Sequence, residues 1–173
     1  EVMGGHTEIS DVVNRPVITV TGVGKVKKDK LVSTGGLHPE DDLVMTKWAG
    51  LEGTSIIAEE KREELLTRIP EQIIDAAAAM REYISVVPEA AVAVNAGVTA
   101  MHDVTEGGIF GALWEVGEAS GVGIIADLDK IPIRQETVEI CEYFDLNPYQ
   151  LGSTGSLLLA APDGNRLVWY LKQ

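Results

Sequence analysis

Apolar residues recur along this chain with two different spacings, which predict helices that alternate with strands. In residues 109–120 the apolar side chains lie three or four positions apart, the spacing of a helix with one buried face. Short runs of aliphatic and β-branched residues predict strands instead. The expected strands cover residues 17–23, 43–46, 98–103, 123–128 and 157–161.

The expected helices lie between these strands, and several carry capping signals. Thr54 or Ser55 is the expected cap of a helix that runs to about Arg68, and Pro70 and Pro88 suit the first turns of the next two helices. Further helices are expected over residues 109–120 and 135–144, and from residue 165 onward. This alternation predicts an α/β or α+β fold in which helices cover a mixed sheet.

Residues 101–108, Met-His-Asp-Val-Thr-Glu-Gly-Gly, hold more potential chemistry than any other stretch of the chain. They predict a strand that ends on Asp103 and turns into a helix, with Thr105 as the N-cap. Gly107 and Gly108 fall in the first turn, where each costs about 1 kcal/mol relative to alanine. Glycine at both positions therefore indicates that something approaches this backbone closely.

Two interpretations of that close approach are open. A helix start offers unpaired amides and the positive end of the helix dipole, so a phosphate or a carboxylate would bind there. Because two bare carboxylates would repel a phosphate without a cation, Asp103 and Glu106 would then be metal ligands or proton carriers. In the alternative interpretation, the glycines only let the helix pack tightly on the strand.

The composition of the chain limits which binding partners and which cell compartment we expect. The 27 acidic and 14 basic residues give a net charge of −13, which argues against a nucleic-acid or anionic-membrane surface and favours a small partner. A single cysteine, Cys141, excludes an internal disulfide and a multi-cysteine zinc site, and it fits a reducing cytoplasm. No apolar run reaches the roughly 18 residues that a membrane span needs. We therefore expect a cytoplasmic protein.

The two ends of the sequence indicate a piece of a longer polypeptide. The chain begins with Glu1 rather than methionine, and its last residues predict a helix without a cap. Near the start, residues 4–8 form a glycine turn with three polar side chains. The four lysines of residues 25–30 predict a solvated linker between two domains.

Five motifs, taken in order, resemble the aminoimidazole ribonucleotide (AIR) synthase superfamily, and within it the HypE-like and AIR-synthase-related members. The match extends over nearly the whole chain, and its most specific parts are the first and third motifs. The motifs are Gly-Gly-His-Thr-Glu (4–8), Gly-Leu-Glu-Gly-Thr (50–54), Met-His-Asp-Val-Thr-Glu-Gly-Gly (101–108), Glu-Ala-Ser-Gly-Val-Gly (118–123) and Ile-Pro-Ile-Arg (131–134).

The resemblance implies a two-domain homodimer that binds ATP and magnesium and phosphorylates an amide, carbonyl or similar acceptor. HypE-like members activate a carboxamide on a carbamoylated cysteine with ATP, which implies a small-molecule or carbamoyl-type acceptor here. In this interpretation residues 1–25 end the N-terminal domain. Residues 31–173 then form most of the C-terminal domain, with a fold like that of the AIR synthase C-terminal domain.

The resemblance also assigns residues to the site. The residues that match a motif close to the nucleotide are Gly4, Gly5, Thr7 and Glu8. Those that match the facing loop of the C-terminal domain are Asp103, Thr105, Gly107 and Gly108. Asp103 is the expected metal ligand and, with Glu106 and His6, an expected catalytic residue. His6 and His102 are candidates for proton transfer, although each would equally suit a hydrogen-bonded structural histidine, the role we favour for His102.

The chain departs from the HypE pattern at two places. Ser153-Thr154-Gly155 stands where HypE-like members have Asn-Glu-Gly, and Glu106 stands where they have an arginine. The carboxylate and the arginine that this chain lacks argue against dehydratase activity specifically. ATP-dependent phosphoryl transfer is therefore the main hypothesis. The alternatives are a non-catalytic binding or scaffold module, and a lone anion-binding domain. Residues 152–156 are expected either to bind an anion or simply to turn.

Overall fold

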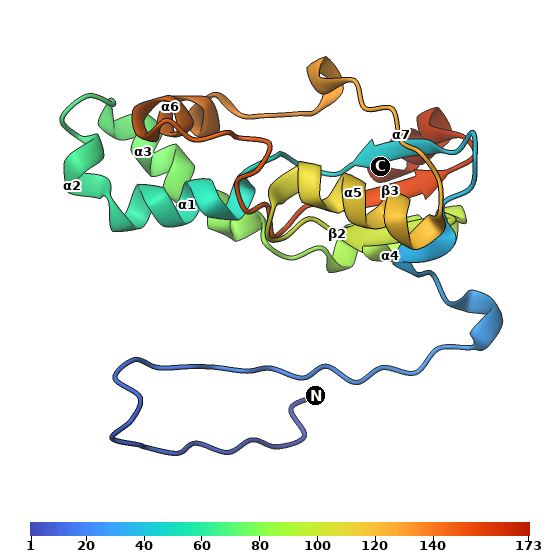
Figure 1. Cartoon of the computed structure of the whole chain (residues 1–173), viewed down its shortest axis with the longest axis horizontal. Coiled ribbons are helices and arrows are strands. Elements are labelled where there is room, and N and C mark those ends of the chain that lie inside the picture. The colour runs from blue at the N-terminus through green and yellow to red at the C-terminus, as the bar shows by residue number, and fades with distance from the viewer. The chain divides into compact units, whose positions relative to one another are not determined.

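A three-stranded antiparallel sheet forms the centre of residues 32–173, the larger of two compact units in this computed structural model of residues 1–173 (Figure 1). The strands are β1 (Asp42–Met45), β2 (Ala100–Asp103) and β3 (Leu157–Ala161), in the order β1-β3-β2. Because β1 and β2 both run antiparallel to β3, their carboxyl ends lie at the same edge of the sheet. One isolated parallel bridge, Ser33 to Ala100, lies outside this antiparallel sheet of three strands.

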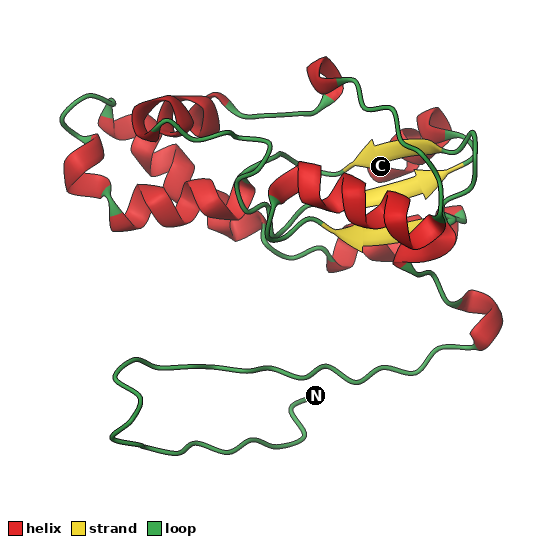
Figure 2. Cartoon of the chain, in the orientation of Figure 1, coloured by secondary structure: helices red, strands yellow, loops and turns green.

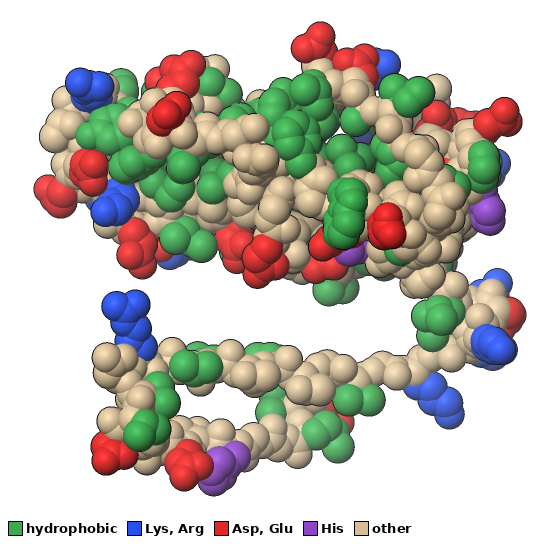
Figure 3. Space-filling view, in the orientation of Figure 1, with side chains coloured by type: hydrophobic (Ala, Val, Ile, Leu, Met, Phe, Trp, Pro, Cys, Tyr) green, Lys and Arg blue, Asp and Glu red, His purple; other side chains and the backbone are tan.

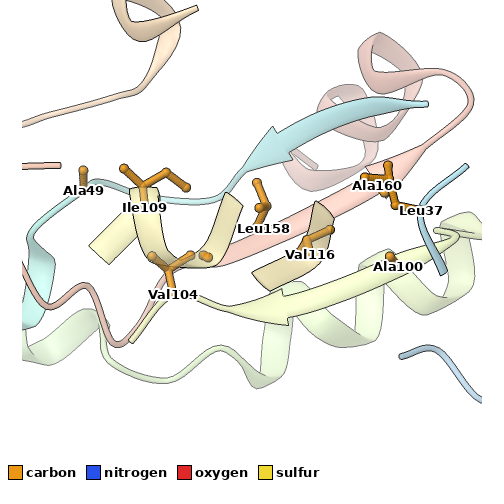
Figure 4. Packing of buried hydrophobic residues seen from close by; sticks show 9 residues of the cluster. Leu37, Ala49, Ala100, Val104, Ile109, Val116, Leu158 and Ala160 are labelled. Carbon is orange, nitrogen blue, oxygen red and sulfur yellow. The ribbon is translucent and has the colours of Figure 1, made fainter. Parts of the chain in front are cut away.

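Helices cover both faces of the sheet, so the predicted α+β fold is confirmed (Figure 2). On one face lies α5 (Gly108–Ser120), whose Ile109, Ala112 and Val116 pack on Ala100 and Leu158 (Figure 4). On the other face, α4 (Val87–Ala96) and α7 (Gly164–Leu171) pack with each other and on the sheet. Helices on both faces explain why all five residues of the central strand β3 are buried.

A third apolar cluster lies among helices and involves no strand. It joins α1 (Leu51–Glu60), α3 (Glu71–Ala78) and α6 (Gln135–Phe144), with Ala58, Ile74 and Ile140 fully buried. The short helix α2 (Arg62–Leu65) and the 3-10 helix η3 (Ala79–Tyr83) complete this part. No helix of the chain is both long enough and apolar enough to cross a bilayer.

Most predicted elements are confirmed, but the start of α1 was predicted wrongly. Gly50, with a left-handed φ of 72°, precedes the helix, which begins at Leu51 rather than after Thr54 or Ser55. Both hydroxyl side chains are buried inside the helix. Thr54 donates a hydrogen bond to Thr137, and Ser55 donates to the carbonyl of Glu52. Thr54 therefore bonds a residue of α6 and Ser55 bonds within α1, so neither hydroxyl caps the helix.

Residues 123–128, predicted to be a strand, form none. They are mostly exposed, and the side chain of Ile125 is fully accessible to solvent, whereas Ile124 is partly buried against the core. A 3-10 turn, η4 (Leu128–Lys130), follows, in which the amide of Asp129 bonds the carboxylate of Asp127. Strand-like composition fails here because these residues make no ladder of hydrogen bonds with the edge strand β1.

The smaller unit, Glu1–Leu31, has no strand, so the strand predicted over residues 17–23 is also wrong. Its apolar side chains are exposed, among them Ile18 at 85% and Val20 at 87% (Figure 3). The only regular element is η1 (Lys28–Lys30). A lone β-branched run cannot form a strand without a partner for its amides and carbonyls, and this chain supplies none.

Candidate functional site

The turn between β2 and α5 places the predicted acids in solvent at the edge of the sheet. β2 ends at Asp103, which is exposed, and the next residue, Val104, is completely buried. The amide of Val104 donates to the carbonyl of Ser156 at 3.0 Å, which extends the β2–β3 pairing by one residue. Anchored in this way, the chain turns outward, and Glu106 is exposed as well.

The cap of α5 differs from the prediction. Gly107, with φ of 81°, occupies the N-cap position, and no side chain caps the helix. Thr105 contributes its carbonyl, which accepts a hydrogen bond from the amide of Gly108 at 3.1 Å. Gly107 is exposed, its amide has no hydrogen-bond partner in the chain, and a β-carbon there would meet only Gly111, at 3.4 Å. Gly107 therefore leaves space for a ligand to approach its backbone.

Gly108 serves a different purpose. It is buried with φ of 60°, and a β-carbon on it would lie 2.5 Å from the carbonyl oxygen of Tyr149 and 2.8 Å from that of Leu151. The amide of Phe110 donates to the same Tyr149 carbonyl at 3.2 Å. The tight-packing interpretation of the glycine pair therefore holds for Gly108, and the ligand-binding interpretation stays a prediction for Gly107. Gly108 lets the chain's own backbone pack on the helix start, whereas Gly107 keeps the outer side of the turn open.

His102 is held from both sides, in agreement with the structural role favoured for it. Its Nδ1 lies 3.0 Å from the hydroxyl of Thr34, and its Nε2 lies 2.7 Å from the carboxylate of Glu115. Only 16% of the imidazole is exposed. Thr34 and Glu115 carry no motif that would have connected them to His102, because they come from a short 3-10 helix and the outer part of α5.

The loop of residues 152–156 is a turn whose hydroxyl groups bond the protein backbone. Ser153 is buried, and its hydroxyl donates to the carbonyl of Leu151 at 2.8 Å and accepts from the amide of Gly50 at 2.6 Å. The hydroxyl of Ser156 donates to the carbonyl of Trp48 at 2.9 Å. Of the two expectations for this loop, the structure supports the turn.

The N-terminal motif belongs to the smaller unit and is entirely exposed. His6 and Glu8 approach each other only loosely, with 3.9 Å between Nε2 and the carboxylate and side chains about four-fifths exposed. A β-carbon on Gly4 or Gly5 would meet no atom within 4 Å. The nucleotide-binding roles of Gly4, Gly5, Thr7 and Glu8, and the catalytic role of His6, stay predictions.

The Asp103–Gly107 turn offers one exposed carboxylate and one unpaired backbone amide. No three acidic, histidine or cysteine side chains gather into a protein-only metal site. Magnesium does not need such a cage, since it keeps several waters and binds one or two carboxylates together with substrate phosphates. Exposed Asp103 fits that role, and the free amide of Gly107 at the positive end of a 13-residue helix fits a phosphate oxygen.

Comparison with known proteins gives consistent matches. Residues 38–172 match the family described as AIR synthase related protein, C-terminal domain. A Methanocaldococcus jannaschii protein named for hydrogenase expression/formation is 28% identical over 174 aligned positions, covering 99% of this chain and 50% of that protein. The carbamoyl dehydratase HypE of Cupriavidus necator is 31% identical over 153 positions, covering 87% and 41% respectively.

The fold has a counterpart among solved structures. The crystal structure of the hydrogenase maturation protein HypE in complex with ATP superposes with a TM-score of 0.66 at 16% identity, over 87% of this chain and 43% of that one. The chain spans about half the length of the curated relatives it matches.

Proposed function

Because the chain belongs to the family of AIR synthase related C-terminal domains, as its motifs predicted, we propose that it is part of an ATP-dependent phosphoryl-transfer enzyme. The acceptor would be a carboxamide or carbonyl oxygen. The similarity to carbamoyl dehydratase HypE supports this acceptor class. The observation that carries the proposal is the open turn, where exposed Asp103 and the free amide of Gly107 lie at the start of α5.

Each residue of the turn has a distinct role in this proposal. Bound Mg-ATP would supply the phosphoryl group and neutralise its charge. Asp103 would hold the cation with one carboxylate, and the amide of Gly107 would donate to a phosphate oxygen, assisted by the helix dipole. Glu106, which is also exposed, would accept a proton from the acceptor group. Thr105 and Gly108 shape the turn through the hydrogen bond between them.

The smaller unit has a role of its own in the proposal. We assign residues 1–25 to the end of an N-terminal domain, in which Gly4, Gly5, Thr7 and Glu8 bind the nucleotide and His6 transfers a proton. The exposed β-branched run of residues 17–23 supports this assignment, because it has strand composition and no partner strand in this chain. The protein would act as a homodimer, like the superfamily that it resembles.

Release of ADP tests the proposal. The protein expressed from its complete gene is incubated with Mg-ATP and a panel of carboxamide and carbonyl compounds, and Asp103→Asn is compared with Glu63→Gln. Glu63 is an exposed acid of the first turn of α2 and serves as the matched control. We expect acceptor-dependent ADP release that Asp103→Asn abolishes and Glu63→Gln leaves unchanged. No ADP release with any acceptor would contradict the proposal.

A second candidate function is a non-catalytic scaffold. The buried Ser153 favours it, since both hydrogen bonds of its hydroxyl go to the backbone where HypE-like members carry the Asn-Glu-Gly turn. A scaffold predicts that Asp103→Asn leaves the cellular function intact. An enzyme predicts that the same substitution destroys it.

A further inference from the structure

Lys47 has a backbone conformation that directs its side chain to an unexpected face of the sheet. It lies two residues beyond the end of β1 and has φ of 53°, which costs a residue with a side chain roughly 1–2 kcal/mol. Alternation along the strand would point Lys47 with Leu43 and Met45, toward α5. The left-handed residue breaks this alternation, and the side chain reaches Glu89 in the first turn of α4 instead.

The Lys47 ammonium group has three polar neighbours. Nζ donates hydrogen bonds to the carbonyls of Ser85 and Gly155, each at 2.7 Å, and forms an ion pair with the carboxylate of Glu89 at 2.8 Å. Only 12% of the lysine side chain is exposed. One side chain therefore joins the end of β1, the segment before α4 and the loop before β3.

Lys47 is the one positively charged partner of the Glu89 carboxylate. The second carboxylate oxygen of Glu89 is buried and has no hydrogen-bond partner. The Glu89 side chain is 22% exposed, so the loss of its positive partner would leave a partly buried charge uncompensated, which is destabilising. Lys47 therefore stabilises the fold by itself. A test of any further role of Lys47 must distinguish that role from the effect on stability.

The loop that Lys47 holds is also the loop that anchors the candidate site. Lys47 binds the carbonyl of Gly155, and the carbonyl of the next residue, Ser156, accepts the amide of Val104. Val104 directly follows Asp103. Gly155 lies close to the segment before α4, because a β-carbon there would be 2.9 Å from the Cα of Ile84. Asp103 is therefore connected to Lys47 through two hydrogen bonds and three residues, Gly155, Ser156 and Val104.

We propose that Lys47 is a positioning residue, which keeps Asp103 in place for phosphoryl transfer by fixing the Gly155–Ser156 segment. This inference rests on the proposed function of the Asp103 turn. Lys47 touches neither acceptor nor nucleotide in this role. Misplacement of a reacting group by about 1 Å can lower a rate by roughly a hundredfold, so a loosened loop would reduce kcat.

The experiment compares three variants of the protein expressed from its complete gene. Lys47→Met removes the hydrogen bonds, Lys47→Met with Glu89→Gln also removes the buried charge, and Lys61→Met is the surface control. Lys61 has a comparable aliphatic stem, and its partner Glu64 lies 3.8 Å away in solvent. The readouts are kcat and KM for ATP, unfolding by urea, and hydrogen exchange at the Val104 amide.

We expect the double variant to regain much of the stability that Lys47→Met loses, while its kcat stays at least tenfold below that of the wild type and its KM changes less. The Val104 amide should exchange at least tenfold faster in Lys47→Met and in the double variant than in the wild type. If kcat returns with stability, or if Val104 exchanges at the wild-type rate in the double variant, Lys47 has no positioning role. Absence of ATP turnover in the wild type would instead remove the proposed function, and the exchange measurement would still test the loop.

Discussion

The amide of Phe110 donates a hydrogen bond to the carbonyl of Tyr149, 3.2 Å away. This bond joins the first turn of α5 to the residues that precede the 152–156 loop, and it lies beside the point where Gly108 meets the same carbonyl. The two adjacent glycines consequently have different neighbours, one the protein's own backbone and the other open space. That difference gives a direct test of which glycine serves packing and which serves ligand binding.

Gly108→Ala should destabilise the fold by about 3 kcal/mol or more, because its β-carbon would lie 2.5 Å from a backbone oxygen and its φ is positive. Gly107→Ala has only the backbone cost of about 1 kcal/mol, since no atom blocks its β-carbon. Urea unfolding of the two variants measures the difference. Equal destabilisation would show that Tyr149–Leu151 does not pack on Gly108 in solution.

His102→Ala should lower stability by about 1–3 kcal/mol, because Thr34 and Glu115 both lose a hydrogen-bond partner in a partly buried place. Urea unfolding and ADP release together check this expectation. Turnover per folded molecule should stay within about twofold of the wild type, because the imidazole is used for structure. A loss of turnover without a loss of stability would assign His102 to catalysis.

Cys141 should be unreactive in the folded protein. The side chain is 2% exposed, and burial raises the pKa of the thiol from its ordinary 9.0 to about 11. Between these values the unfolded thiol ionises while the folded one does not, so stability is full below pH 9 and falls as the pH rises through about 11. Thiolate absorbance against pH measures the ionisation, and a midpoint near 9 in the folded protein would contradict the expectation.

Arg134 and Glu136 should contribute stability that acid removes. The hydrogen bond and charge of Arg134 lower the pKa of Glu136, with contacts of 3.0 and 2.9 Å. This contribution is present above the unfolded pKa and is lost as the pH falls through the lower folded value. The arginine is 35% exposed, so we expect about 1 kcal/mol at most. Urea unfolding of the wild type and Glu136→Gln at pH 7 and pH 3 measures the difference in their free energies of unfolding. An equal difference at both pH values would refute the contribution of this ion pair.

Local sequence patterns were sufficient for much of the fold. The helix 135–144 and the strand 157–161 have the predicted bounds, and the unbroken apolar run of the strand suits its burial on both faces. The predictions for residues 17–23 and 123–128 failed because a strand depends on a partner that composition does not reveal. The prediction of the α1 cap failed because Thr54 donates its hydrogen bond to Thr137, which is 83 residues away in the sequence.

The candidate site was predictable only in outline. The motif identified Asp103, Glu106 and the glycine pair, because acids and glycines at a helix start leave a local signal. It could not separate Gly107 from Gly108, since that depends on Tyr149 packing from elsewhere in the chain. Lys47 was missed as well. Nothing around it in the sequence indicates that its amine reaches Ser85, Gly155 and Glu89 together.

Isothermal titration calorimetry tests most directly whether the Asp103–Gly107 turn binds metal-bound ATP. The protein expressed from its complete gene is titrated with ATP, with and without magnesium, as wild type, Asp103→Asn and Glu63→Gln. We predict magnesium-dependent binding that Asp103→Asn weakens at least tenfold and Glu63→Gln leaves unchanged. Equal affinity in wild type and Asp103→Asn, or no binding of ATP at all, would contradict the account.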